Sequence, residues 1–129
     1  MENKDREVIN MYDDWIRMKQ RNLSFEAYFD KTKINKVAIY GMNRLGYTLL
    51  EELESCDIHV VYGIDKVLAG KAYGVPVKSL SDEWEPVDAI IVSAFQYYDE
   101  IYPIIRSKNP QIEIIPLDVL IKRILLENV

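Results

Sequence analysis

Four runs of aliphatic and β-branched residues alternate along the chain with segments of helical periodicity, and this alternation limits the fold more than any other feature. The runs are INKVAIY at 34–40, IHVVYGID at 58–65, VDAIIVSA at 87–94 and IEIIPL at 112–117. Continuous apolar runs of this length are typical of strands buried on both faces of a parallel sheet. A shorter run, VPVKS at 75–79, predicts one more strand.

The segments between these runs have the spacing of amphipathic helices. In the first of these segments, Leu45, Leu49 and Leu53 lie one turn apart. The helix that contains Pro103 can tolerate this proline only if its first turn lies near residue 103. Strands that alternate with helices over short loops predict an α/β fold. We expect a three-layer, Rossmann-like open parallel sheet of about five strands in the order 3-2-1-4-5.

Residues 1–33 precede this pattern and are predicted to form an N-terminal helical arm, followed by a Rossmann-like nucleotide-binding domain over 34–129. Residues 5–20 form one amphipathic helix, and Ser24 can cap a second, short one. The arm carries apolar and aromatic side chains that must be buried, namely Val8, Met11, Tyr12, Trp15, Met18, Phe25, Tyr28 and Phe29. They can pack on the following domain, or in a homodimer or a partner chain.

Bulk properties exclude several classes of protein. The chain has 129 residues and a net charge of −5, which argues against a general nucleic-acid binder. No run approaches the roughly 20 apolar residues that span a bilayer, and the charged N-terminus is unlike a signal peptide. Cys56 is the single cysteine, and His59 has no second histidine or cysteine at metal-ligand spacing. We expect a cytoplasmic protein without a metal.

The stretch KVAIYGMNRLGY at 36–47 is the strongest indication of a ligand site. Gly41 permits the tight turn after the first strand, and Gly46 permits the next helix to lie close to the sheet. The helix that begins here would offer free N–H groups to an anion. Asn43 stands where a dinucleotide-binding turn has its middle glycine. The predicted phosphate-binding residues are Gly41, Met42, Asn43, Arg44, Leu45 and Gly46.

Residues after the second and fourth strands would complete this site. Asp65 lies 19 positions after Gly46, about where such a turn requires an acid for the ribose hydroxyls, although an aspartate here can also simply open a turn. Lys66 can attract a 2′-phosphate. Ser93 and Phe95, with the tyrosines that follow, can form a platform for a base or sugar, or can belong to the core.

The sequence lacks a recognisable catalytic set. It has no Tyr-x-x-x-Lys pair, no Gly-x-Ser-x-Gly elbow and no Walker lysine after the glycine turn. A binding module is therefore favoured over an enzyme. The enzymatic alternative is a sugar-nucleotide reductase or dehydratase with Tyr97 or Tyr98 as the acid.

The motifs IYGMNRLG, YGIDK, YGVPV and DAIIVSA together resemble those of a known group of domains. Residues 34 to about 120 look like the Rossmann-like NAD(P)- or CoA-type domain that precedes sugar O-acyltransferases of the sialic-acid type and is appended to bacterial surface-polysaccharide enzymes. The resemblance implies a nucleotide-binding module, with NAD(P) or a nucleotide-sugar as ligand, in polysaccharide or nucleotide-sugar metabolism. The alternative is an interaction domain without a ligand, whose helical arm dimerises or binds a glycosyltransferase.

Overall fold

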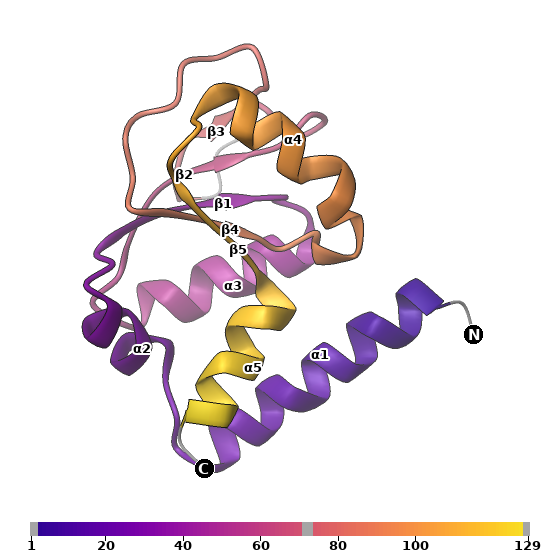
Figure 1. Cartoon of the computed structure of the whole chain (residues 1–129), viewed down its shortest axis with the longest axis vertical. Coiled ribbons are helices and arrows are strands. Elements are labelled where there is room, and N and C mark those ends of the chain that lie inside the picture. The colour runs from indigo at the N-terminus through magenta and orange to yellow at the C-terminus, as the bar shows by residue number, and fades with distance from the viewer. Residues whose placement is uncertain (1–2, 71–73, 128–129) are drawn as a thin grey trace.

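The computed structural model describes residues 3–70 and 74–127, and Tyr73 of the YGVPV motif lies outside them. Its described strands form a single parallel sheet in the order β3-β2-β1-β4-β5 (Figure 1). The predicted fold class and strand order are thereby confirmed. The strands are β1 (Lys36–Tyr40), β2 (His59–Ile64), β3 (Val77–Lys78), β4 (Ala89–Val92) and β5 (Glu113–Pro116).

Helices cover both faces of the sheet because successive residues of a strand point to opposite faces. Val37 and Ile39 of β1 belong to a core shared with α1 (Asn3–Gln20), α2 (Phe25–Thr32), α3 (Arg44–Glu54) and α5 (Leu117–Glu127). Ala38 and Tyr40 belong to a second core, under α4 (Tyr98–Lys108). The sheet is the middle of three layers, with α1 and α2 added outside one of them (Figure 1).

The aromatic side chains of the N-terminal arm are buried within the chain itself. Helix α1 packs against α5, and the Trp15 ring meets the Phe25 ring edge-on at 5.6 Å between centroids. Ser24 caps α2 as predicted, since its Oγ accepts a hydrogen bond from the N–H of Ala27 at 3.1 Å. Asn22, at φ 58°, turns the chain after α1 in the left-handed conformation that asparagine tolerates. The arm therefore adds to the hydrophobic core on the face of the sheet that α3 and α5 cover.

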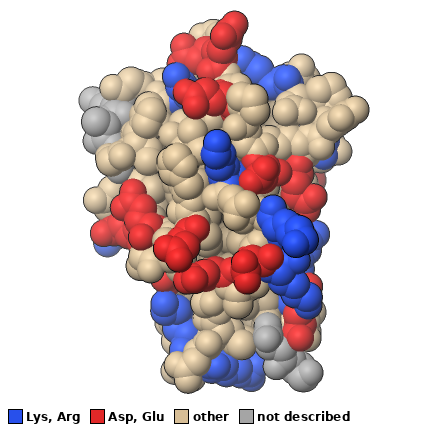
Figure 2. All heavy atoms as spheres, turned by 90° about the vertical axis from the view of Figure 1, so that its left-hand side faces the viewer, with Lys and Arg blue, Asp and Glu red and all other residues tan. Residues whose placement is uncertain are grey.

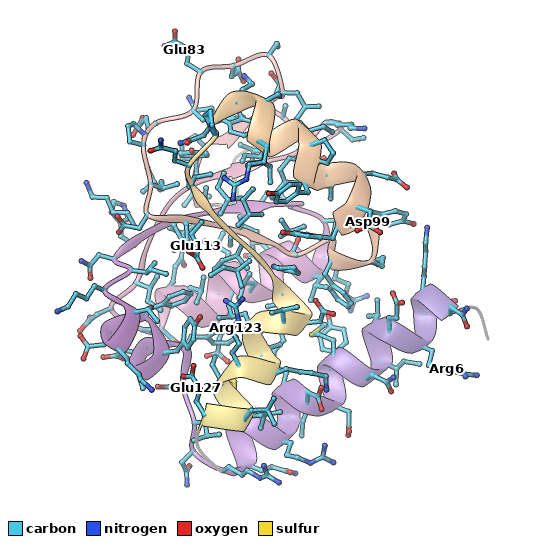
Figure 3. The ribbon with its side chains drawn as sticks, viewed as in Figure 1. Arg6, Glu83, Asp99, Glu113, Arg123 and Glu127 are labelled. Carbon is cyan, nitrogen blue, oxygen red and sulfur yellow. The ribbon has the colours of Figure 1, made fainter. Side chains whose placement is uncertain are left out.

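Helix α4 begins at Tyr98, and Pro103 follows in its second turn. A proline at this position leaves the carbonyl of Asp99 without its usual i+4 donor. Both residues are exposed, and Asp99 lies on the outside of the first turn of α4, so water can serve that carbonyl (Figure 3). The helix consequently accommodates the proline one turn after its start.

The strands run from left to right in the view of Figure 1, so that their carboxyl ends and the start of α4 lie on the right. Figure 2 shows the opposite edge, where acidic and basic side chains are interspersed and a band of acidic groups crosses the face. None of the helices within residues 3–70 and 74–127 has the length and apolar character needed to cross a bilayer.

Candidate ligand-binding site

The turn after β1 depends on glycine at its first position. Gly41 has a φ of 99°, a conformation that residues with a side chain rarely adopt. Its N–H donates to the carbonyl of Ile64 at the end of β2, at 2.8 Å. A Cβ at this position would lie 2.7 Å from the Oγ of Ser93, so a side chain is excluded by contact as well as by conformation.

Gly46 brings the first turn of α3 against this loop. A Cβ on Gly46 would lie 1.8 Å from the carbonyl oxygen of Gly41, which is backbone and cannot move aside. The first N–H groups of a helix have no acceptor within the helix, and those of α3 lie beside the Gly41 turn at the carboxyl edge of the sheet. The predicted role of Gly46, close packing of the helix on the sheet, matches this contact.

Asn43 occupies the N-cap position of α3 with extended backbone, at φ −69° and ψ −165°. The turn therefore does not need left-handed backbone at the position of the missing middle glycine. The side chain of Asn43 is exposed and makes no capping hydrogen bond. Arg44 next to it is also exposed. An amide and a guanidinium thus stand at the start of α3, where an anion would bind.

Met42 contributes to the site through its backbone and to the core through its side chain. Only 1% of Met42 is exposed, and its thioether fills the space that a Cβ on Gly63 would take. The N–H of Met42 donates to Oδ2 of Asp65 at 2.9 Å. This amide of the predicted phosphate turn is therefore already engaged within the protein.

Asp65 joins the turns that follow β1 and β2. Besides the bond from Met42, its Oδ1 accepts from the N–H groups of Val67 and Leu68, at 2.9 and 3.0 Å. A carboxylate offers about four acceptor positions, and three are used here. Of the two roles predicted for Asp65, the structure shows the turn-forming one, with one position left for a further donor. Lys66 is exposed beside it.

Ser93 and Phe95, both predicted to lie near the ligand, have different positions. Ser93 is buried at the end of β4, and its hydroxyl donates to the carbonyls of Tyr40 and Gly41, which ties β4 to the glycine turn. Phe95 is buried in the core that the sheet shares with α1, α2, α3 and α5. Tyr97, two residues later, is 42% exposed and supplies the aromatic surface at this edge.

Two pockets meet at the Gly41 turn, where the strand order reverses between β1 and β4. Open parallel sheets bind ligands at this place. The arm-side pocket, of about 380 Å³, is lined by Val8, Tyr12, Gly41, Asn43, Arg44, Leu45, Gly46, Ser93, Ala94, Gln96 and Tyr97. The α4-side pocket, of about 400 Å³, is lined by Tyr40, Gly41, Asp65, Lys66, Val67, Ala94, Tyr97, Glu100, Ile101 and Ile104. Gly41, Ala94 and Tyr97 belong to both.

Each pocket contains a buried polar atom without a hydrogen-bond partner. Among the described residues, the buried side-chain atoms in this state are the hydroxyl of Tyr40, in the α4-side pocket, and Oε1 of Gln96, in the arm-side pocket. Burial raises the pKa of Tyr40, and the negative charge of Asp65 raises it further, so the phenol keeps its proton. Neither Tyr40 nor Gln96 was among the residues predicted from the sequence to contact a ligand. The sequence signal that could have indicated Tyr40 was its position as the last residue of a buried strand.

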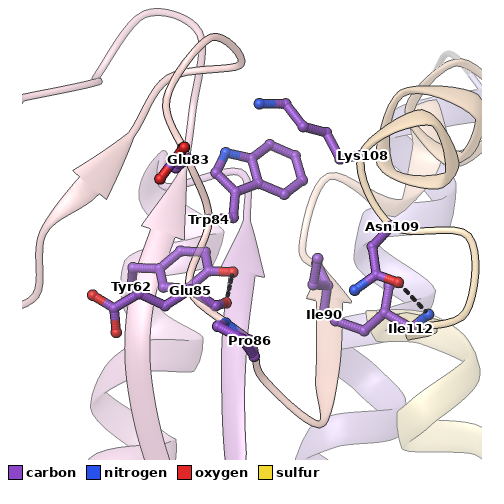
Figure 4. Close-up of a pocket in the computed structure, with 9 residues that line it drawn as sticks. All are labelled: Tyr62, Glu83, Trp84, Glu85, Pro86, Ile90, Lys108, Asn109 and Ile112. Carbon is purple, nitrogen blue, oxygen red and sulfur yellow. Dashed lines mark hydrogen bonds between the residues drawn. The ribbon is translucent and has the colours of Figure 1, made fainter.

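A third pocket, of about 330 Å³, lies under the segment that leads into β4 (Figure 4). Two of its polar groups are paired within the protein. The hydroxyl of Tyr62 donates to the carbonyl of Glu85 at 2.7 Å, and Nε1 of Trp84 donates to the carbonyl of Ser79 at 3.0 Å. Burial, and then the nearby charge of Glu85, raises the pKa of Tyr62 to about 12. The buried polar groups of this pocket are thus paired, unlike the Tyr40 hydroxyl and the Gln96 carbonyl at the Gly41 turn.

The α4-side pocket holds the carboxylates of Asp65 and Glu100, but neither the histidine nor the cysteine of the chain lies at the Gly41 turn. His59 begins β2, and Cys56 follows the end of α3, so both lie at the opposite edge of the sheet. The part of the chain that the structure describes contains no group of three or more histidine, cysteine, aspartate or glutamate side chains able to hold a metal ion. The arrangement is suited to binding through hydrogen bonds, helix N–H groups and two cations, Arg44 and Lys66.

Comparison of the chain with models of known protein families, with curated proteins and with solved structures gives no match in any of the three. The fold defines an α/β protein whose described strands form one five-stranded parallel sheet.

Proposed function

We propose that the protein is a non-catalytic module that binds a nucleotide or a nucleotide-sugar, with NAD(P) among the candidate ligands. The observation that carries this proposal is the pair of pockets that meet at Gly41, each with an unpartnered buried polar atom. An unsatisfied buried group costs about 1–3 kcal/mol, and a ligand that completes its hydrogen bond recovers part of that cost. Unpaired atoms in both pockets favour a ligand that spans them.

The chemistry of the two pockets fits different parts of a nucleotide. The arm-side pocket holds the start of α3 and Arg44, which together attract phosphate. The α4-side pocket has apolar walls from Ile101 and Ile104, and the hydroxyl of Tyr40 within it can bond the edge of a base or a ribose hydroxyl. The polysaccharide or nucleotide-sugar pathway remains an expectation from the sequence resemblance.

The absence of catalysis is proposed from the same geometry. Asp65 already accepts three backbone hydrogen bonds, so its carboxylate serves to hold the turns after β1 and β2 together. Tyr98 has a pKa raised chiefly by burial, so it is a weak acid for proton transfer at neutral pH. A sugar-nucleotide reductase or dehydratase would require a base beside it.

Thermal-shift measurements with NAD, NADP, UDP-glucose and coenzyme A test the proposal. A ligand at one hundred times its dissociation constant should stabilise the protein by about 2.7 kcal/mol. Arg44→Ala should weaken binding about tenfold, the effect of losing one charge-assisted hydrogen bond of about 1.5 kcal/mol. Arg21→Ala removes an exposed arginine after α1 and is the matched control. Absence of a shift with all four compounds would contradict the proposal.

One observation favours the alternative, an interaction domain that uses the helical arm. Ile9 and Ile16 of α1 are 53% and 56% exposed, although other apolar residues of α1, such as Trp15, are buried. Sizing chromatography with light scattering tests this role. A dimer that dissociates in the double variant Ile9→Glu/Ile16→Glu would support it, whereas a monomeric wild-type chain would contradict homodimerisation. Removing the whole arm is unsuitable because its aromatic residues form part of the core.

A further inference from the structure

We propose that α1 is part of the ligand-binding site, and that Tyr12 and Lys4 bind the phosphate-bearing part of the ligand together with the start of α3. This inference rests on the proposed function and adds residues that lie outside the strand ends of the sheet. Its basis is the position of α1, which forms one wall of the arm-side pocket through Val8 and Tyr12. Without α1 this pocket would lack that wall and be open to solvent.

Tyr12 is held in place by the core of the protein. Its ring stacks on Trp15, with 6.2 Å between centroids and 10° between planes, and Trp15 in turn packs edge-on against Phe25. Trp15 is only 6% exposed, so the ring on which Tyr12 stacks is held in the core. The Tyr12 ring therefore presents a rigid surface to the arm-side pocket, facing the residues that begin α3.

The first turns of α1 are held more weakly. Residues 3–7 are exposed, and the described contact that links them to the site is the ammonium of Lys4, which lies 4.0 Å from the centroid of the Tyr97 ring. Tyr97 lines both pockets, so a ligand that spans them lies beside the ring that Lys4 contacts. Arg44 stands at the start of α3, in the same pocket. Arg44 would thus contact a phosphate from within the pocket, and Lys4 would reach it from its place over the Tyr97 ring.

Binding of such a ligand should be coupled to the docking of α1. Lys4 gains an anionic partner while its contact with Tyr97 is kept, and Tyr12 gains a contact across the pocket. The first turns of α1 should therefore become more protected when the ligand binds. Arg6, on the same helix, points away from the body of the molecule (Figure 3) and provides a matched control.

The fluorescence of Trp15 can report ligand binding near α1. The chain has two tryptophans, so the variant Trp84→Phe keeps Trp15 as its single tryptophan. In that variant, titration with NAD and, separately, with UDP-glucose should change the Trp15 emission saturably for the nucleotide that gives the thermal shift. Lys4→Ala should weaken that binding about two- to fivefold, the range for an exposed ion pair between the ammonium and a phosphate, and Arg6→Ala should leave it unchanged. Hydrogen exchange of residues 3–12 should slow on binding.

The failure of this inference differs from the failure of the proposed function. If a nucleotide stabilises the protein while Trp15 emission, hydrogen exchange in α1 and the affinity of Lys4→Ala all stay unchanged, then α1 is only a part of the core and the inference is overturned. If none of NAD, NADP, UDP-glucose and coenzyme A stabilises the protein, the proposed function is overturned and the inference falls with it. Circular dichroism of Lys4→Ala establishes that the variant is folded.

Discussion

Tyr40→Phe and Tyr62→Phe should change the stability of the ligand-free protein in opposite directions. Both tyrosines lie on the α4 face of the sheet and are nearly fully buried. The hydroxyl of Tyr62 donates to the carbonyl of Glu85, whereas the hydroxyl of Tyr40 has no partner. The two substitutions therefore remove the same atom from similar surroundings and differ in whether it is hydrogen-bonded.

The expected magnitudes follow from these two states. Loss of the Tyr62 hydrogen bond should destabilise the protein by about 1 kcal/mol, the usual net contribution of such a bond. Removal of the unpaired Tyr40 hydroxyl should stabilise the protein by about 1 kcal/mol, near the lower end of the cost of an unsatisfied buried group. For a chain of this size each kcal/mol corresponds to roughly 4 °C in melting temperature. The melting temperatures of the two variants should thus differ by roughly 8 °C.

Calorimetry or urea unfolding of the two variants and the wild type, without ligand, measures this difference. The same samples with the best-binding nucleotide test the function of the hydroxyl, since Tyr40→Phe should bind about fivefold more weakly, equivalent to about 1 kcal/mol. Tyr62→Phe should keep the wild-type affinity. A destabilised Tyr40→Phe would refute the reasoning, because it would mean that the Tyr40 hydroxyl is already satisfied in the free protein.

Gly46→Ala, with Gly70→Ala for comparison, tests the packing at the Gly41 turn, and Asp88→Asn tests the contribution of a carboxylate to stability. Gly46→Ala should destabilise the protein by about 3 kcal/mol or more in urea unfolding, because its Cβ meets the backbone oxygen of Gly41, whereas Gly70→Ala, in open space at φ 83°, should cost only about 1–2 kcal/mol of backbone strain. The pKa of Asp88 is lowered by hydrogen bonds from two backbone N–H groups at the start of β1. Its contribution to stability is therefore present above about pH 4 and lost as the pH falls through its folded pKa, so the difference between Asp88→Asn and wild type should shrink on acidification.

The fold was predictable because its signals are local and repeated. Runs such as VDAIIVSA form strands that are buried on both faces, and the helices between them carry leucines one turn apart. Given alternating strands and helices, the handedness of crossovers and the reversal after the third strand leave few arrangements. The sequence also indicated the cap at Ser24, since it follows from the chemistry of a single residue.

The site was predictable only in part, because its remaining features depend on contacts between distant segments. The glycine turn could be predicted from the spacing of Gly41 and Gly46 after an apolar strand. The engagement of Asp65 by three N–H groups depends on how the turns after β1 and β2 meet, and no spacing reveals it. The unpaired hydroxyl of Tyr40 is likewise a property of its surroundings. Tyr12 of α1 enters the pocket from a helix that the sequence pattern separates from the sheet.

Asn43 shows how a position can matter to a ligand and not to the fold. The left-handed residue of the turn is Gly41 and the close contact is at Gly46, so the position between them needs neither property of glycine. Its side chain is exposed, makes no capping bond and lines the arm-side pocket. Asn43→Gly should therefore change the unfolding free energy by less than about 0.5 kcal/mol, since glycine is nearly as good an N-cap residue.

The same substitution should alter the affinity for the nucleotide, measured by titration calorimetry. Asn43→Gly should weaken a nucleotide that accepts a hydrogen bond from the amide, and should strengthen one whose phosphates need close approach to the backbone of the turn. A loss of affinity would therefore mean that the Asn43 amide donates a hydrogen bond to the ligand. A gain in affinity would mean that the Asn43 side chain obstructs the approach of the phosphates. Equal affinity in the two proteins, together with a large loss of stability in Asn43→Gly, would show instead that Asn43 serves the fold.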